Sequence, residues 1–106
     1  MSQNNFGADF SNLTDCSHLS QLSLHNCTTN STHIVPNTPG KQASCKIFYA
    51  ISRNPQQQIT PVEAGQGLIL FGDYVNEERA QANSHPNIRL LLDVIENDEV
   101  WTVTPS

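Results

Sequence analysis

The chain has 106 residues, of which five are Lys or Arg and ten are Asp or Glu, so its formal net charge at pH 7 is −5. This length accommodates one domain. So few basic residues argue against nucleic-acid binding and against a polybasic membrane anchor, because both need clustered Lys and Arg beside phosphates. Leu, Ile, Val and Phe make up about a quarter of the chain, which is enough for one modest core.

The first ten residues, MSQNNFGADF, have neither the positive nor the apolar region of an export signal. No stretch approaches the roughly 20 apolar residues that cross a bilayer, so we expect no membrane segment. The three cysteines are odd in number and widely spaced, unlike the disulfide framework of a secreted domain. We therefore expect a cytoplasmic protein whose thiols are free.

The first 16 residues are mostly polar and offer little to bury, so residues 1–16 are predicted to be a poorly ordered tail. Residues 17–106 are predicted to form a single domain. Within it, β-rich stretches near 19–25 and 32–35 flank a cluster of Asn, Ser and Thr residues, which is typical of a hairpin. Pro36 ends the second stretch, and a turn over 37–40 follows.

Two helices are expected next. Apolar residues spaced by three and four predict a helix over 42–53. A second helix begins at the sequence Thr60-Pro61-Val62-Glu63, since Thr60 can cap it, Pro61 suits the first helical position and Glu63 can complete a capping box. Its apolar stripe extends to about Gln81.

The segment 88–95 fits two interpretations, because its apolar residues alternate as in a strand but also recur at helical spacing after Pro86. We favour the strand, since Glu96, Asp98 and Glu99 would place negative charge at the negative end of a helix dipole. Residues 97–98 then suit a turn into a strand over 100–104. The resulting fold class is α+β: a four-stranded, mostly antiparallel sheet of two hairpins, with two helices packed on one face.

Three short segments carry a family resemblance. The sequence IVPNTPGK over 34–41, GLILF over 67–71, and HPNI over 85–88 followed by three leucines resemble the bacterial domain-of-unknown-function family 2322. The resemblance covers roughly residues 17–104. It implies a small, single-domain, cytoplasmic bacterial protein and supplies no activity.

Two thiols and two imidazoles near the start of the chain, Cys16, His18, His25 and Cys27, could form a tetrahedral zinc site. Their spacing differs from that of closed zinc sites, whose paired ligands are usually separated by two to four residues. We interpret them as ordinary thiols and surface imidazoles, and we predict neither a metal nor a cofactor.

The best candidates for a polar site lie in two proline-bearing loops. His85 precedes Pro86 and Asn87, and histidine is the residue type that can change its charge near neutral pH, although a structural role for His85 is favoured. Asn37 and Lys41 flank the turn at Pro39 and Gly40. They could bind an anion together with the N-terminus of the following helix, or the turn could simply lead into that helix.

These observations leave two hypotheses for function. The first is a non-enzymatic interaction module that binds a protein partner or a second copy of itself, because no complete catalytic set is present and the surface is poor in charge. The alternative is a small ligand-binding protein or enzyme whose single pocket lies between His85 and Asn87 on one side and Asn37 and Lys41 on the other.

Overall fold

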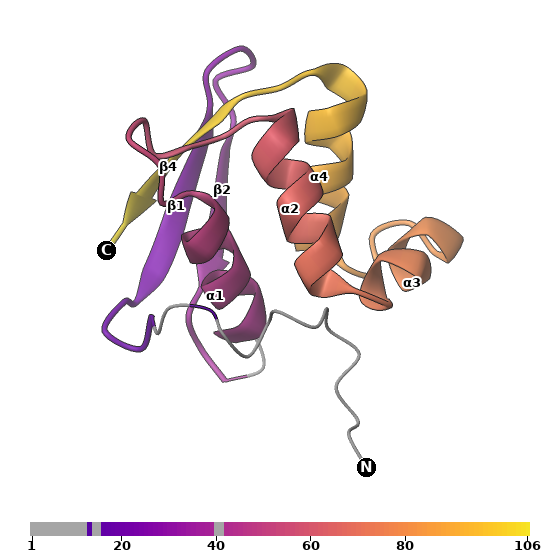
Figure 1. The fold of residues 1–106 in the computed structure, drawn as a ribbon, viewed down its shortest axis with the longest axis horizontal. Helices are drawn as coiled ribbons and strands as arrows, with labels where there is room; N and C mark the ends of the chain where they lie inside the picture. The colour runs from indigo at the N-terminus through magenta and orange to yellow at the C-terminus, as the bar shows by residue number, and fades with distance from the viewer. Residues whose placement is uncertain (1–12, 14–15, 40–41) are drawn as a thin grey trace.

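Four strands and four helices make up the part of the chain that the computed structural model describes, residues 13, 16–39 and 42–106 (Figure 1). In chain order they are β1 (Gln21–Asn26), β2 (Thr32–Pro36), α1 (Gln42–Ile51), β3 (Gln58–Ile59), α2 (Pro61–Phe71), α3 (Tyr74–Ala80), α4 (Pro86–Asn97) and β4 (Trp101–Pro105). The four strands form one antiparallel sheet in the order β2-β1-β4-β3. The prediction of an α+β fold with a four-stranded antiparallel sheet is therefore confirmed, although one of its strands is β3 and not the predicted strand over 88–95. The expected number of two helices is wrong.

The N-terminal hairpin is present as predicted. Leu22 of β1 lies opposite Val35 of β2, and both are fully buried. The turn depends on Asn26, whose side-chain oxygen accepts hydrogen bonds from the backbone N–H groups of Thr28 and Thr29 at 2.8 and 3.1 Å. This is the local bonding that makes Asn a frequent turn residue.

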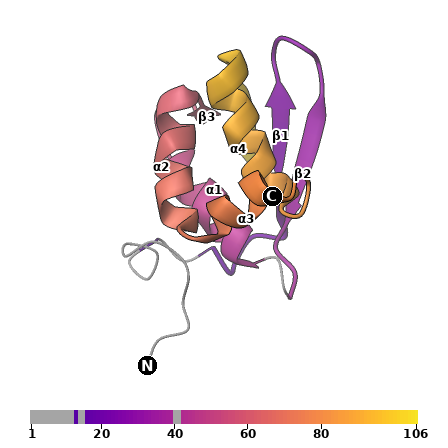
Figure 2. The ribbon, with the colours of Figure 1, turned by 90° about the vertical axis from the view of Figure 1, so that its right-hand side faces the viewer.

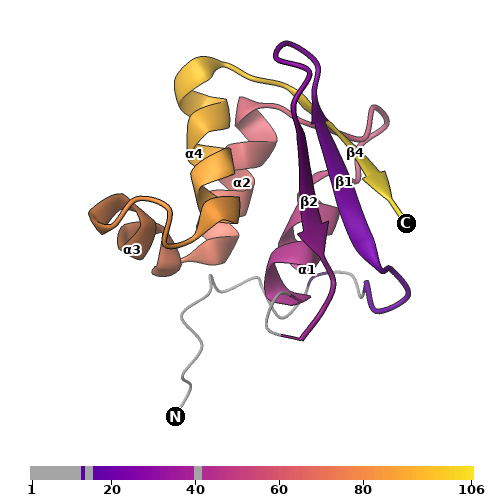
Figure 3. The ribbon, with the colours of Figure 1, turned by 180° about the vertical axis from the view of Figure 1, so that it is seen from behind.

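The helices lie to one side of the sheet (Figure 2). Alternate residues of the strands point toward them and are buried, among them Leu24, Val35 and Val103. Figure 3 shows the same fold from behind, turned by 180° from the view of Figure 1. By the strand alternation, the side chains on the open face of the sheet belong to uncharged or histidine residues: Gln21, Ser23, His25, Thr32, Ile34, Pro36, Gln58, Thr102 and Thr104.

Helix α2 begins as the capping sequence predicts. Thr60 is its N-cap, Pro61 is its first residue, and the Glu63 carboxylate accepts hydrogen bonds from the Thr60 backbone N–H and hydroxyl. The helix does not continue to Gln81 as expected, because Gly72 adopts a left-handed φ of 62°. The Gly72 N–H bonds to the carbonyls of the last turn, and α3 starts in a new direction two residues later.

The prediction of a strand over 88–95 is wrong, and with it the second hairpin, because this segment belongs to α4. The helix buries Ile88, Leu91 and Val94, which recur every three residues. Each such side chain contributes about 1.5–3 kcal/mol on burial, whereas each unfavourable dipole contact costs about 0.3–1 kcal/mol. Asp98 caps the C-terminus of the helix, because it adopts the left-handed conformation and its N–H donates a hydrogen bond to the Val94 carbonyl.

Packing between α2 and α4 depends on Gly67. A Cβ added at this residue would lie 2.8 Å from a methyl carbon of Leu91 and 3.0 Å from one of Ile51 in α1. The three helices therefore meet at a point where only a hydrogen fits.

Candidate functional site

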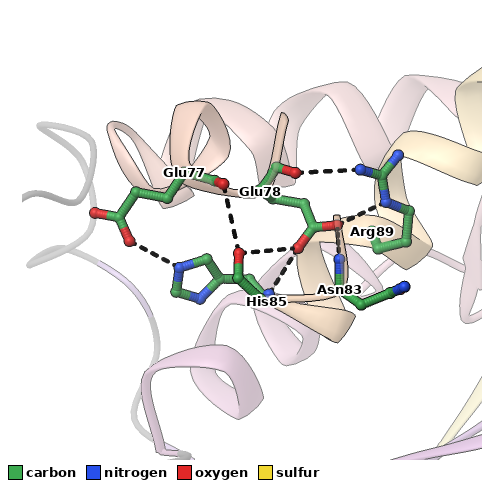
Figure 4. A network of polar contacts seen from close by, with 6 residues as sticks. Glu77, Glu78, Asn83, His85 and Arg89 are labelled. Atoms are coloured by element: carbon green, nitrogen blue, oxygen red, sulfur yellow. Dashed lines mark hydrogen bonds and ion pairs between the residues drawn. The ribbon is translucent and has the colours of Figure 1, made fainter. Parts of the chain in front are cut away.

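The most densely bonded polar group lies at the corner between α3 and α4 (Figure 4). Glu78 of α3 is fully buried, and its carboxylate accepts hydrogen bonds from the backbone N–H groups of Asn83 at 2.7 Å and His85 at 2.6 Å. Arg89 of α4 donates its Nε to the same carboxylate at 2.7 Å and one terminal nitrogen to the Glu78 carbonyl at 3.2 Å. One buried carboxylate thus holds α3, the following loop and α4 together.

Burial by itself raises the pKa of the Glu78 carboxyl, because it penalises the charged form. The backbone donors of Asn83 and His85 and the guanidinium of Arg89 outweigh this effect and hold the pKa below its ordinary value. Glu78 is therefore ionised at neutral pH, and its charge is compensated inside the protein rather than by water.

His85 is the N-cap of α4, directly before Pro86. Its Nε2 lies 2.9 Å from the Glu77 carboxylate, and its ring meets that of Tyr74 edge-on with a centroid distance of 5.6 Å. A carboxylate orients the imidazole, which is about one third exposed. Both side chains that contact this imidazole, Glu77 and Tyr74, belong to α3.

The other predicted site residues contact different parts of the fold. Asn37 donates its amide to the carbonyls of Cys16 and Leu19 at 2.9 and 2.7 Å, which fastens the segment before β1. Asn87 of α4 lies 2.7 Å from Nε2 of His33 and links α4 to β2. Lys41 lies outside the described residues. A common pocket of Asn37, Lys41, His85 and Asn87 thus remains a prediction.

The four metal-ligand candidates lie in separate environments. Cys16 is buried in the core, and the rings of His18 and Tyr49 meet edge-on. His25 points to the open face of the sheet, and the exposed thiol of Cys27 contacts the Thr102 hydroxyl. Over the described residues, no group of three or more His, Cys, Asp or Glu side chains is arranged to hold a metal ion.

The cysteines are all free thiols. Burial, together with the neighbouring thiol of Cys16, raises the pKa of Cys45 to about 12. Cys45 is therefore unsuited to act as a nucleophile, since the thiolate is the reactive form.

A groove of about 410 Å³ opens between α3 and α4. Its lining combines two guanidinium groups, two aliphatic side chains and one carboxylate: Arg79, Arg89, Leu92, Ile95 and Glu96. This composition was missed from the sequence because 88–95 was expected to be a strand, which would have placed Leu92 and Ile95 on opposite faces.

The outer face of α2 carries the most exposed large apolar side chains of the described structure. Val62 is 67% exposed and Ile69 is 72% exposed. They are seven residues apart, so they lie on one side of the helix, two turns from each other.

The architecture is that of a small α+β protein with one antiparallel sheet, in which the buried carboxylate of Glu78 links α3 to α4. None of the helices in the described ranges is long and apolar enough to cross a membrane. Residues 6–105 match the family described as an uncharacterized protein conserved in bacteria, DUF2322, and the chain belongs to that family. No curated protein and no solved structure matches it significantly. The family resemblance noted from the sequence is thereby confirmed.

Proposed function

We propose that the protein is a non-enzymatic interaction module that associates with a second copy of itself through the outer face of α2. The observation that carries this proposal is the exposure of Val62 and Ile69 on a helix whose opposite face is already in the core. Large apolar side chains that gather on an exposed helix face commonly mark an interaction surface. We place this association in the cytoplasm, where free thiols stay reduced.

The outer face of α2 carries no charge that two copies would have to bring together. The single charged residue of this helix is Glu63, which is bonded to Thr60 at the N-terminus. The residues between Val62 and Ile69 on the exposed side are Gly65 and Gln66. Two copies with a net charge of −5 each can therefore approach here with little local repulsion.

The face is also self-complementary. The midpoint between residues 62 and 69 falls between Gly65 and Gln66, so a twofold axis there pairs Val62 with Ile69 of the second copy, twice. Among the described residues, no atom outside the neighbouring residues and the backbone of α2 itself lies within 4 Å of a Cβ added at Gly65, which leaves room for the second helix to approach closely. In Figure 2, α2 lies on the opposite side of α4 from β1 and β2, so two copies joined through its outer face would extend in opposite directions.

The expected association is weak. Four aliphatic side chains that are already about one third buried would contribute about 1–2 kcal/mol each. Loss of rigid-body freedom costs about 4–15 kcal/mol. At the favourable end, about 8 kcal/mol of burial less about 4 kcal/mol of lost freedom leaves about 4 kcal/mol, which corresponds to a dissociation constant on the order of 1 mM.

Sedimentation velocity over a concentration series from roughly 20 μM to 2 mM tests the proposal. The mean mass is expected to rise from 11.7 kDa toward twice that value. Ile69→Glu should keep the protein monomeric, because it places two buried carboxylates in the interface. Ile34→Glu is the matched control, since Ile34 is 41% exposed on the open face of the sheet.

A wild-type protein that remains monomeric at the highest concentration contradicts self-association. Association that survives Ile69→Glu but is lost in Ile34→Glu contradicts the assignment to α2, and would place the interface on the sheet. A third variant, Gly65→Leu, should weaken association without loss of folding, because its side chain projects into open space in the monomer.

A further inference from the structure

The groove between α3 and α4 has the composition of a site for a small zwitterion. Its five lining residues supply positive charge, negative charge and aliphatic surface at once. We propose that this groove binds a free aliphatic α-amino acid, with the ligand carboxylate on Arg79 and Arg89, its ammonium on Glu96, and its side chain on Leu92 and Ile95.

The positive end of the groove is unusual for this chain. Only five residues of the whole sequence are Lys or Arg, and two of them line this one groove. Arg89 is held in a fixed orientation, since its Nε and one terminal nitrogen bond to Glu78. A guanidinium has five N–H donors, so these two bonds leave donors for a ligand carboxylate. Arg79 of α3 is exposed and contributes the second guanidinium.

The negative end is set by the helix. Glu96 follows Arg89 by seven residues, which places the two backbone positions roughly 10 Å apart along α4 on the same side. Both side chains line the groove, so an α-amino acid lying along α4 would place its carboxylate at Arg89 and its ammonium at Glu96. A simple carboxylic acid would meet the Arg residues but would also face the carboxylate of Glu96.

The apolar part lies between these charges. Leu92 is one turn from both Arg89 and Glu96, and it is half-buried. Ile95 is 43% exposed beside it. An aliphatic ligand side chain would cover both and gain binding free energy from the buried apolar surface, whereas a polar side chain would gain none there. The volume of about 410 Å³ lies within the range of small-molecule sites.

This inference is independent of self-association through α2, because it uses residues of α3 and α4. It predicts a ligand of modest affinity, since a molecule with so few atoms rarely binds more tightly than on the order of 0.1–1 mM in an open groove.

Titration of the 15N- and methyl-labelled protein with L-leucine tests the inference by NMR. We expect saturable shifts of the Leu92 and Ile95 methyl signals. The matched probes are 4-methylpentanoate, which lacks the ammonium group, and 3-methylbutylamine, which lacks the carboxylate. Each should bind at least about fivefold more weakly than leucine.

Two variants assign the charges. Arg79→Gln should weaken binding of leucine and 4-methylpentanoate but leave 3-methylbutylamine unchanged. Glu96→Gln should weaken leucine and the amine, and should strengthen 4-methylpentanoate. Arg53→Gln is the control, since Arg53 lies over the Tyr49 ring, outside the groove lining.

The inference fails if leucine gives no saturable shifts, if the three probes bind equally, or if the shifts map outside the groove. It also fails if Arg53→Gln weakens leucine as much as Arg79→Gln does. Both Arg79 and Glu96 are exposed, so their variants should fold, and the unchanged amide spectrum of the sheet reports that they have.

Discussion

Replacement of Glu78 by Gln removes the charge at the centre of the α3–α4 corner while keeping the size of the side chain. The amide would keep one oxygen, but its NH2 group would face N–H donors of Asn83, His85 or Arg89 at the distances of 2.6–2.7 Å seen for the carboxylate. Because Glu78 is fully buried, water cannot replace the lost acceptor.

The magnitude follows from these contacts. Removal of one partner of a buried ion pair costs about 3–5 kcal/mol, and a hydrogen bond to a charged group is worth about 1.5–3 kcal/mol. Arg89 is 29% exposed and can be partly solvated, which reduces the loss. We expect Glu78→Gln to lower the free energy of unfolding by about 2–4 kcal/mol, a large part of the stability of such a domain.

Urea denaturation followed by fluorescence of the single tryptophan measures this change, because Trp101 is buried in β4. Glu77→Gln is the matched control on the same helix. The Glu77 side chain is more than half exposed and, among the described residues, its carboxylate bonds to the surface imidazole of His85, so its replacement should cost at most about 0.5 kcal/mol. Equal effects of the two substitutions would refute the structural role assigned to Glu78.

The pH dependence of folding stability is a second way to measure the contribution of Glu78. The folded-state pKa of Glu78 lies below its ordinary value of 4.5, so its contribution is complete above that pH and is lost as the pH falls through the folded-state pKa. Wild-type stability should therefore fall in acid more steeply than that of Glu78→Gln. Parallel curves for the two proteins below pH 4.5 would contradict the assignment.

Further predictions concern packing, thiols and a second carboxyl. Gly65→Ala should stabilise the fold by about 0.5–1 kcal/mol. The Gly67→Ala variant should be less stable than the Gly65→Ala variant by about 1–3 kcal/mol, because the methyl group added at Gly67 meets buried side chains and the one added at Gly65 does not. A thiol reagent at pH 8 should label Cys27 rapidly and Cys45 only on unfolding; equal rates would contradict the burial of Cys45. The pKa of Asp93 is raised, chiefly by burial, so its ionisation opposes folding as the pH rises. Asp93→Asn should therefore stabilise the protein by a few tenths of a kcal/mol at pH 7, as measured by urea denaturation.

Local chemistry in the sequence was enough to predict several elements. The N-terminal hairpin follows from strand-forming residues around a polar turn, and α2 begins where Thr60, Pro61 and Glu63 satisfy its first N–H groups. These features depend on neighbours within a few residues, so they can be inferred without knowledge of the rest of the fold.

The candidate sites depend on contacts between distant segments, which is why the sequence predicted them poorly. Glu78 continues the apolar stripe of Phe71 and Val75, a signal that it is buried, but nothing local showed that Arg89 and two loop N–H groups would compensate its charge. Likewise, Asn87 bonds to His33, a residue 54 positions away.

Sequence alone determined the α+β class, the capped start of α2, the hairpin and the family to which the chain belongs. Tertiary structure decided that residues 86–97 form a helix, because the core offers Ile88, Leu91 and Val94 a continuous apolar surface that outweighs the dipole penalty at the C-terminus. Tertiary structure also decided which apolar residues remain exposed to solvent. Val62 and Ile69 resemble core residues in sequence, and they are exposed because of the direction in which α2 packs.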